Sequence, residues 1–343
     1  MRALVLEAFG KMVVQERPDP IADDDEALIA IFATGICGSD LHGYTGDNGR
    51  RVPGQIMGHE TVGRIAALGA ATDGTGLAVG QLVTFNPVVP CGACEASQSG
   101  DWQHCADRTL IGVHAKPDAA FADYVTVPAS NVVPLSDGIP AEYGALIEPL
   151  AVSFHAARRA QVKSGDNVLI IGGGPIGQSS ILAAKRRGAA KVIVSEVDTA
   201  RRALCEQLGA IAVDPMLSSV NVQVRALFGG LADVAIDAVG ITHTLNEALA
   251  STHFGGIVCL VGMGLPQVEL DAYSVSTAER SIVGSFTYSD GDFREAAQWV
   301  SDSPPELPYL ISRMVSLADA PEAFARLAAH DGTPGKVLVH FGN

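Results

Sequence analysis

Two short patches in the first sixty residues carry side chains that could bind a metal ion. Cys37-Gly38-Ser39-Asp40-Leu41-His42 supplies a thiol, and Gly58-His59-Glu60 supplies an imidazole beside a carboxylate. A further carboxylate lies at Glu148-Pro149. One thiolate, one imidazole and one carboxylate suit tetrahedral zinc whose fourth position stays open to water or substrate. Each patch taken singly indicates little, because a lone cysteine is more often a small buried hydrophobe and a lone histidine a satisfied core residue.

A glycine-rich turn near the middle of the chain is typical of dinucleotide binding. Gly172, Gly174 and Gly177 form a G-x-G-x-x-G pattern directly after the apolar run Asn167–Ile171. The first glycine permits a tight turn, the second lets the backbone approach the pyrophosphate, and the third allows close packing of helix on strand. The helix that follows presents N–H groups and its positive dipole end to the phosphates.

The residue that follows the next apolar run distinguishes the two nicotinamide dinucleotides. Glu196 lies about 20 residues beyond the glycines, where an acid binds the adenine ribose hydroxyls and repels a 2′-phosphate. The sequence therefore favours NAD over NADP. Arg201 and Arg202 follow and could accommodate a phosphate, but they lie in a predicted helix, where a solvated charge is the simpler interpretation.

The elements that must position these residues follow two different sequence patterns in two parts of the chain. Residues 1–151 hold short runs between glycines and prolines, which predict a small irregular β-barrel; examples are Glu26–Phe32, Thr61–Leu68 and Gln81–Phe85. From Asn167 on, apolar strands alternate with helix-period segments, which predicts an α/β fold with a doubly wound parallel sheet. The strands predicted for this sheet are Asn167–Ile171, Lys191–Ser195, Ala232–Asp237, Gly256–Val261 and Ser281–Ser285.

The last sixty residues show the patterns of both helices and a strand. Helices are predicted at Asp292–Ser301 and Ala320–His330, followed by a strand at Lys336–His340, and we expect this tail to return to the first domain. The resulting division assigns residues 1–151 and 286–343 to a catalytic domain. Residues 152–285 form the dinucleotide-binding domain.

Composition excludes several classes of protein. A chain of 343 residues with 48% hydrophobic residues suits two globular domains. The net charge of −15 argues against nucleic-acid partners and anionic membranes. The N-terminus lacks a signal-peptide pattern, and no uninterrupted run of about 18 apolar residues predicts a membrane span. Six cysteines, three of them within fifteen residues, do not resemble a secreted disulfide framework, so we expect a cytoplasmic protein.

Six motifs occur in one order over essentially the whole chain: CGSDLH, GHETVG, CGAC, EPLAVSFHA, GGGPIG and VGMG. In this combination the sequence resembles the medium-chain dehydrogenase/reductases, specifically the zinc-containing alcohol and polyol branch with sorbitol, butanediol and threonine dehydrogenases. The resemblance implies a GroES-like catalytic domain beside a Rossmann domain. It also implies hydride transfer between NAD(H) and a small secondary alcohol, diol or polyol and its ketone.

The resemblance implies a role for each candidate metal ligand. Cys37 and His59 would bind zinc, and Glu148 would be the third protein ligand. Glu60 would lie close enough to exchange onto the metal or to replace Glu148, and the order of the two carboxylates stays open. Asp40 would accept the proton on the far nitrogen of His59 and so fix its tautomer.

The same resemblance implies a path for the proton. A zinc-bound alcohol loses its proton far more readily than a free one. The proton would pass through Ser39, the nicotinamide ribose and His42 to solvent. The candidate sites are therefore Cys37, His59 and Glu148 for the metal, Ser39, His42 and Glu60 for catalysis, and Gly172, Gly174, Pro175, Ile176, Gly177 and Glu196 for the cofactor.

One departure from the family concerns a second, structural zinc that four cysteines hold. Cys91, Cys94 and Cys105 are present here, but Ser97 occupies the third cysteine position. A neutral hydroxyl is a poor zinc ligand, so we expect this lobe to bind no structural zinc or to bind it weakly. His104 is a conceivable substitute, but beside Cys105 it would need unusual geometry.

A second departure concerns the substrate. Sorbitol-type relatives carry a Tyr and an Arg where this chain has Gly43 and Thr287, so two polar contacts for a sugar alcohol are missing. This weakens a sorbitol assignment but leaves other polyols open. A compact secondary alcohol or diol is an alternative, with Tyr44, Phe286 and Tyr288 either near the pocket or in the core.

Two other functions are alternatives. A zinc-free quinone or enone reductase that uses NADPH would keep the fold, but it needs neither the ligand set nor Glu196. A non-catalytic NAD-binding protein would not need Ser39 and His42. We also expect a homodimer or homotetramer, because Ser281–Ser285 could form a sheet edge that pairs across a twofold axis.

Overall fold

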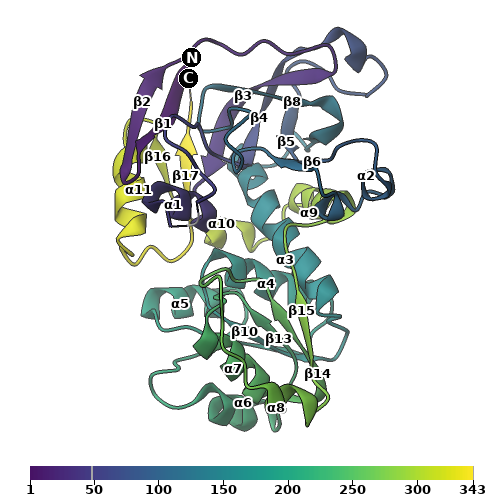
Figure 1. The fold of residues 1–343 in the computed structure, drawn as a ribbon, viewed down its shortest axis with the longest axis vertical. Helices are drawn as coiled ribbons and strands as arrows, with labels where there is room; N and C mark the ends of the chain where they lie inside the picture. Colours follow the sequence, from purple (N-terminus) through teal and green to yellow (C-terminus); the bar gives the residue numbers. More distant parts are fainter. Residues whose placement is uncertain (48, 343) are drawn as a thin grey trace. The chain divides into compact units, whose positions relative to one another are not determined.

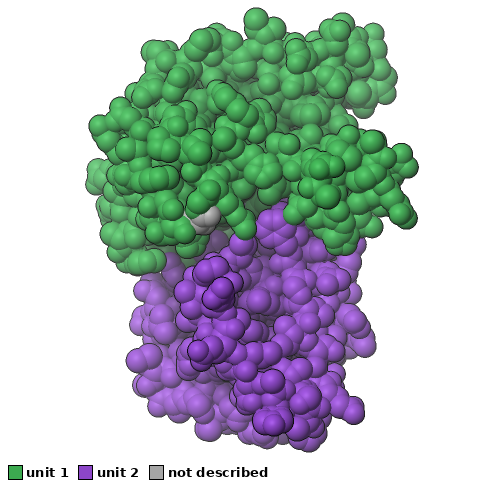
Figure 2. Space-filling model, in the orientation of Figure 1, with its two compact units in different colours: residues 1–148, 289–343 green, residues 149–288 purple. Residues whose placement is uncertain are grey.

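The chain divides after Glu148 and again after Tyr288. The computed structural model describes residues 1–47 and 49–342. Unit 1 comprises Met1–Glu148 and Ser289–Asn343, and unit 2 comprises Pro149–Tyr288 (Figure 2). Each unit is built on its own main sheet.

Unit 2 contains a six-stranded sheet in which every neighbouring pair is parallel (Figure 1). Its strands lie in the order β12 (Ile211–Val213), β11 (Lys191–Ser195), β10 (Asn167–Ile171), β13 (Ala232–Asp237), β14 (Thr252–Leu260) and β15 (Ser281–Gly284). Counted along the chain, this is the 3-2-1-4-5-6 order of the doubly wound dinucleotide-binding fold. The predicted fold class is therefore confirmed.

Five of these strands correspond to predicted apolar runs. β10, β11 and β13 have the predicted bounds, whereas β14 begins four residues earlier than predicted, at Thr252. The sequence did not predict β12, because a strand of three residues is too short to show a period.

Helices connect successive strands of the unit 2 sheet. They are α4 (Pro175–Arg186), α5 (Thr199–Gln207), α6 (Val220–Phe228), α7 (Thr242–Ser251) and α8 (Ala272–Ser276), and α3 (Ile147–Arg159) precedes β10. α4 begins with Pro175, whose fixed φ and missing N–H suit the first helical position. Its buried side packs on β10 and β11, which fixes the start of the helix directly after the glycine turn.

The main sheet of unit 1 is largely antiparallel. Its strands lie in the order β16 (Ile311–Ser316), β17 (Lys336–His340), β3 (Glu26–Gly35), β4 (Glu60–Leu68), β5 (Leu82–Phe85) and β9 (Val132–Pro134), and β8 (Tyr124–Pro128) also pairs with β3. Smaller sheets are formed by β1 (Arg2–Ala8) with β2 (Lys11–Glu16) and by β6 (Val88–Val89) with β7 (Thr109–Leu110). Because β17 lies beside β3, the C-terminal segment completes the sheet begun by the N-terminal residues.

The helices of unit 1 are short. They are α1 (Gly38–Thr45), α2 (Glu95–Ser99), α9 (Asp290–Ser301), α10 (Leu307–Leu310) and α11 (Ala320–Ala328). In both units, as far as the described residues go, no helix combines the length and the apolar character needed to cross a bilayer.

An aromatic cluster fixes α1 against the body of unit 1. Phe324 of α11 packs edge to face on Phe121, with ring centroids 5.5 Å apart, and lies 5.9 Å from the ring of Tyr44 in α1. The Tyr44 hydroxyl donates a hydrogen bond to Gly10 O at 2.7 Å. Tyr44 therefore belongs to the core, and this packing holds the helix that carries Ser39 and His42.

Candidate active site

The ligand atoms of Cys37, His59 and Glu60 converge in unit 1, where all of them lie within 4.8 Å of one another. Cys37 directly precedes α1, and Glu60 is the first residue of β4. β3 and β4 pair Gly35 with Glu60, so the end of one strand and the start of its neighbour bring the two patches together. The structure thus gathers a thiol, an imidazole and a carboxylate at one point, which is the chemistry of a zinc site.

Gly35 leaves the space that the Glu60 side chain occupies. A Cβ added at Gly35 would lie 2.2 Å from Glu60 Oε2, so any larger residue would displace the carboxylate. Glu60 is completely buried and His59 is 5% exposed. Gly35 therefore leaves room for the Glu60 carboxylate within the cluster.

Asp40 links both patches to a buried arginine. Its Oδ2 accepts a hydrogen bond from the amide of Cys37 at 3.0 Å, which closes the first turn of α1. Its Oδ1 lies 3.6 Å from His59 Nδ1 and 3.6 Å from Arg51 Nη2. Arg51 in turn donates to Val113 O at 2.8 Å. Asp40 is fixed between a cation and the imidazole, a position from which a carboxylate orients a metal-binding histidine.

The two residues of the predicted proton path lie on α1. Ser39 is half-buried, and its Oγ lies 3.4 Å from His59 Nε2. His42 is exposed in the last turn of the helix. The helix thus presents a hydroxyl next to the cluster and an imidazole to solvent.

The cluster also includes a lysine from the far end of the chain. Lys336, the first residue of β17, forms a buried ion pair with Glu60 Oε1 and donates to Ile36 O at 3.4 Å. Sequence reasoning missed both Lys336 and Arg51. No local signal marks Lys336, because a lysine that opens an apolar strand is normally solvated. Arg51 follows another arginine, a pattern typical of an exposed loop.

Negative charge dominates the surroundings of His59. Burial by itself lowers the pKa of His59, but Asp40, Cys37 and Glu148 together raise it to about 10. Burial likewise lowers the pKa of Lys336, and Glu60, Cys37 and Glu148 raise it above its ordinary value. Surroundings that hold protons this firmly also attract a metal cation.

The donor set fits a zinc ion. Asp40 Oδ1 and His59 Nδ1 face each other at 3.6 Å, whereas Glu60 Oε2 is, within the described residues, buried without a hydrogen-bond partner. Such atoms are few in folded proteins and call for an explanation such as a bound ion. Glu148, the other predicted carboxylate ligand, is half-buried in the first turn of α3 and acts on the cluster through its charge.

The glycine turn of unit 2 is shaped for a phosphate group. Gly172 has φ +93°, a region that favours glycine. A Cβ at Gly177 would lie 1.8 Å from Gly172 O, whereas one at Gly174 would meet no heavy atom within 4 Å. Pro175 and Ile176 open α4 at this point, so its N–H groups face the same turn.

A hydrogen bond holds the Glu196 side chain at the glycine turn. Its Oε2 accepts a hydrogen bond from Gly173 N at 2.7 Å, and its Oε1 accepts one from Asp198 N at 2.8 Å. Arg202 pairs with Asp214 at 3.0 Å and donates to Glu196 O at 2.8 Å. The carboxylate of Glu196 therefore lies at the turn. The Arg202 guanidinium already has partners in Asp214 and the backbone carbonyl of Glu196.

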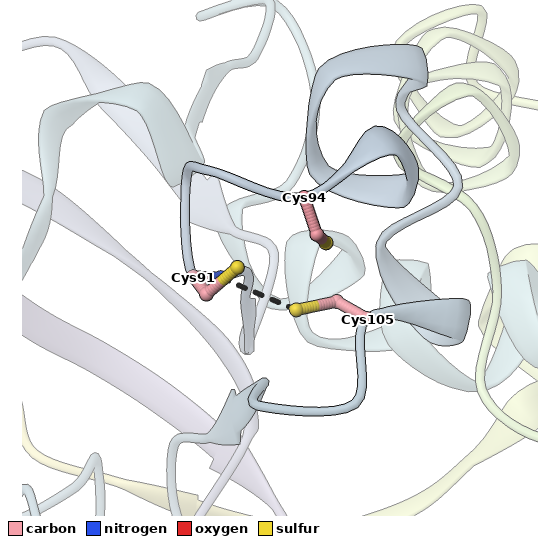
Figure 3. Close-up of side chains that lie close together, drawn as sticks. All are labelled: Cys91, Cys94 and Cys105. Atoms are coloured by element: carbon pink, nitrogen blue, oxygen red, sulfur yellow. Dashed lines mark hydrogen bonds between the residues drawn. The ribbon is translucent and has the colours of Figure 1, made fainter.

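Three cysteines form a second cluster in unit 1 (Figure 3). The sulfur atoms of Cys91, Cys94 and Cys105 lie within 4.8 Å of one another, and Cys91 N donates to Cys105 Sγ at 3.4 Å. Ser97 Oγ lies 3.4 Å from Cys91 Sγ and 3.1 Å from Cys94 Sγ, at the place of a fourth ligand. The Ser97 hydroxyl and then the backbone amides of Ala93 and Cys94 lower the pKa of Cys91 to about 6.

The structure gives a reason for Gly43, one of the two departures from the sorbitol-type pattern. A Cβ at Gly43 would lie 2.4 Å from Arg51 Cγ, so the arginine that contacts Asp40 occupies the space a tyrosine would need. Thr287 adopts φ +51°, which is uncommon for a residue other than glycine. Tyr288 is fully buried, whereas Phe286 is 38% exposed, so Phe286 alone of this pair presents an aromatic surface.

Several known proteins resemble this chain. Residues 23–137 match the alcohol dehydrogenase GroES-like domain, and residues 175–302 match the zinc-binding dehydrogenase family. L-galactonate-5-dehydrogenase of Escherichia coli (strain K12) is 34% identical over 328 residues, which is 95% of each chain. Sorbitol dehydrogenase of Bacillus subtilis (strain 168) is 30% identical over 352 residues, covering 99% of this chain and 97% of that one.

A solved structure shares the fold over nearly the whole length. A zinc-binding dehydrogenase from Sinorhizobium meliloti 1021, crystallised with NADP, superposes with a TM-score of 0.90 at 32% identity. The match covers 99% of this chain and 98% of the other.

Proposed function

Because this chain belongs to the zinc-containing medium-chain dehydrogenase/reductases, we propose that it transfers a hydride between NAD(H) and a polyol or other small secondary alcohol and its ketone. The observation that carries the proposal is the convergence of Cys37, His59 and Glu60 in one buried cluster. The names of two relatives, L-galactonate-5-dehydrogenase and sorbitol dehydrogenase, support a polyhydroxylated substrate.

In this proposal Cys37 and His59 hold one catalytic zinc ion together with a carboxylate, and the two candidates for it are Glu148, in the first turn of α3, and Glu60, within the cluster. When bound, zinc supplies a Lewis acid for the substrate oxygen and the nicotinamide supplies the hydride acceptor. Asp40 keeps a proton on His59 Nδ1, which leaves Nε2 as the metal-binding nitrogen.

Ser39 is the proposed first acceptor of the substrate hydroxyl proton. Its Oγ lies beside His59 Nε2, the side of the ring that faces away from Asp40. His42 is exposed on the same helix and releases the proton to solvent. A relay of this kind carries charge out of the cluster without exposing the cluster itself to water.

The dinucleotide in the proposal is NAD. Glu196 lies against the glycine turn, where its carboxylate accepts hydrogen bonds from ribose hydroxyls and repels a 2′-phosphate. Arg202 is engaged by Asp214 and by backbone carbonyls, which supports the same choice. Since one relative was crystallised with NADP, the test includes both dinucleotides.

The function is tested by measuring NADH or NADPH formation with a panel of alcohols, diols, polyols and sugar acids. Each substrate is assayed with zinc added and after treatment with a chelator. We expect NAD-dependent turnover of at least one polyol that the chelator abolishes and zinc restores. Full activity in protein shown to be free of metal would instead favour the zinc-free reductase, and dinucleotide binding without any turnover would favour a non-catalytic protein.

A pair of cysteine variants locates the activity. Cys37→Ser should abolish turnover and leave NAD affinity largely intact, because the proposed dinucleotide contacts come from the glycine turn and Glu196. Cys259→Ala is the matched control, since this thiol is buried within β14. Wild-type turnover by Cys37→Ser would overturn the ligand assignment.

We also propose a homodimer or homotetramer. β15 is the last strand of the six-stranded sheet, and an exposed strand edge favours pairing with a second copy. Light scattering on the purified protein tests this, and a mass of 35.5 kDa, that of one chain, would contradict it.

A further inference from the structure

The six cysteines of the chain differ in their exposure to solvent. Cys205 and Cys259 are completely buried, and burial raises the pKa of each thiol to about 12, so both are unreactive. The cysteine of the candidate active site is half-buried. In the three-cysteine cluster, Cys91 is exposed, Cys94 is half-buried and Cys105 is completely buried. The most accessible thiol therefore has two further thiols beside it.

The backbone brings the side chains of Cys91 and Cys94 together in the loop that precedes α2. Gly92 lies between them with φ +77°, a left-handed conformation that favours a tight turn. The sulfur atoms of the cluster point toward one another (Figure 3), and all three lie within 4.8 Å of one another. A disulfide has a sulfur–sulfur distance of about 2.05 Å, so two of these atoms need to approach by less than about 3 Å to form one. Rotation of two short side chains supplies such a movement.

Ser97 and Cys105 surround the other two thiols without completing a set of four thiolates. Cys105 Sγ accepts a hydrogen bond from Cys91 N at 3.4 Å, and its burial shields it from solvent. Ser97 Oγ lies 3.4 Å from Cys91 Sγ and 3.1 Å from Cys94 Sγ, close to both of the more accessible sulfur atoms. A fourth thiolate would add the charge and the soft ligand that hold zinc in a closed site, whereas a hydroxyl adds neither. The thiols of Cys91 and Cys94 are therefore available for other chemistry.

We propose that Cys91 and Cys94 are a site of reversible oxidation, at which hydrogen peroxide closes a disulfide between them. In the first step the Cys91 sulfur attacks one peroxide oxygen, the O–O bond breaks, a sulfenic acid forms and one water molecule leaves. In the second step the Cys94 sulfur attacks the Cys91 sulfur, the S–O bond breaks, and the departing hydroxide takes the Cys94 proton as a second water molecule. The two thiols lose two electrons, which reduce the peroxide to water. Exchange with an external dithiol reverses the reaction.

Counting and mapping the thiols after peroxide treatment tests the site. The wild-type protein is dialysed against a mild chelator and treated with hydrogen peroxide, and the remaining thiols are alkylated after denaturation. We expect two of the six thiols to be lost, peptide mapping to link Cys91 to Cys94, and dithiothreitol to restore all six. An unchanged thiol count, a link from Cys91 to Cys105, or irreversible sulfinic acid at Cys91 would overturn the proposal.

Two single variants separate the roles of the sulfur atoms. In Cys94→Ser the second step is blocked, so Cys91 should stop at the sulfenic acid, which dimedone traps. Cys105→Ser is the matched control and should form the disulfide as the wild type does, because Cys105 takes no part in the reaction. If this buried substitution prevents folding, the peptide map of the wild-type protein still identifies the pair. Loss of the disulfide in a folded Cys105→Ser variant would contradict the assignment.

A zinc-loaded variant tests whether the missing fourth thiolate is what leaves the pair reactive. Ser97→Cys with zinc bound should form the disulfide roughly tenfold or more slowly than the wild type, because a closed set of four thiolates engages both sulfur atoms. Equal rates of oxidation in the two proteins would refute this explanation. None of these measurements uses alcohol turnover, so their outcome is independent of the proposed function.

Discussion

The carboxylate of Glu196 accepts a hydrogen bond from the backbone amide of Gly173 at 2.7 Å. The acid after β11 and the turn after β10 are thus joined before any cofactor arrives, although 23 positions separate them in the sequence. A side chain already seated against the turn needs little reorganisation to bind a ribose, which favours tight and selective binding.

This relationship predicts the effect of replacing the acid. Glu196→Ala should raise the KM for NAD roughly 10- to 100-fold, because a charged hydrogen bond contributes about 1.5–3 kcal/mol. The KM for NADP should rise less or fall, since repulsion of the 2′-phosphate is removed. Steady-state kinetics with both cofactors measures this, and Glu206→Ala, an exposed carboxylate on α5, is the control. An unchanged KM for NAD would show that Glu196 serves the turn alone.

The two glycines of the turn should respond differently to alanine. At Gly177 a methyl group would lie 1.8 Å from Gly172 O, so we expect Gly177→Ala to lower the free energy of unfolding by about 1–3 kcal/mol or more. At Gly174 the methyl group meets no protein atom, so Gly174→Ala should fold normally but bind NAD weakly because the methyl fills space meant for the pyrophosphate. Thermal denaturation and NAD titration separate the two effects. Equal stability of both variants would contradict the interpretation.

The three-cysteine cluster predicts the metal content. With the Ser97 hydroxyl at the fourth position, we expect one zinc ion per wild-type chain after dialysis against a mild chelator. Ser97→Cys restores a fourth thiolate and should retain a second ion, because a closed set of four thiolates binds zinc tightly. Metal analysis by mass spectrometry gives the count, with Ser99→Cys on the same helix as the control. Two firmly held ions in the wild type would contradict the prediction.

A carboxylate outside the active site predicts a pH dependence of stability. Asp331 accepts a hydrogen bond from the Thr333 hydroxyl at 2.7 Å and lies 3.2 Å from Arg326 and 3.4 Å from Arg313. The Thr333 hydroxyl, against the opposing effect of burial and with help from both arginines, lowers the pKa of Asp331. An acid whose pKa is lower in the folded than in the unfolded protein stabilises the folded state. This contribution is fully present at pH values above the ordinary pKa of 3.8, and it is lost as the pH falls through the pKa of the folded state.

Asp331→Asn should therefore destabilise the protein by about 1 kcal/mol at pH 7. The difference should stay constant down to about pH 5 and shrink at lower pH. Urea denaturation at a series of pH values measures it. Asp302→Asn is the control, because that carboxylate accepts its hydrogen bond from the neutral amide of Gln298. A difference that grows as the pH falls would have the wrong sign and would reject the explanation.

Local patterns predicted the dinucleotide-binding half of the fold well. Buried parallel strands are continuous apolar runs, and the glycine turn between strand and helix is itself a local structure, so β10, β11 and β13 could be located to the residue. β12 was not predicted because its three residues are too few to show a hydrophobic period. Tyr44 could not be assigned from the sequence, because only the packing on Phe324 shows that it belongs to the core.

By itself the sequence determined the chemical types available to this protein: a thiol, an imidazole and carboxylates in recognisable motifs, and a turn that only glycine can form. Side-chain chemistry and backbone conformation are local properties, so they can be read from neighbouring residues. Only the tertiary structure decided which charges meet, as when Lys336 pairs with Glu60 across 276 positions and Arg51 approaches Asp40. Sheet pairing of β17, β3 and β4 brings Lys336 to Glu60, and such pairing joins strands that are distant in the chain and whose sequences do not identify their partners.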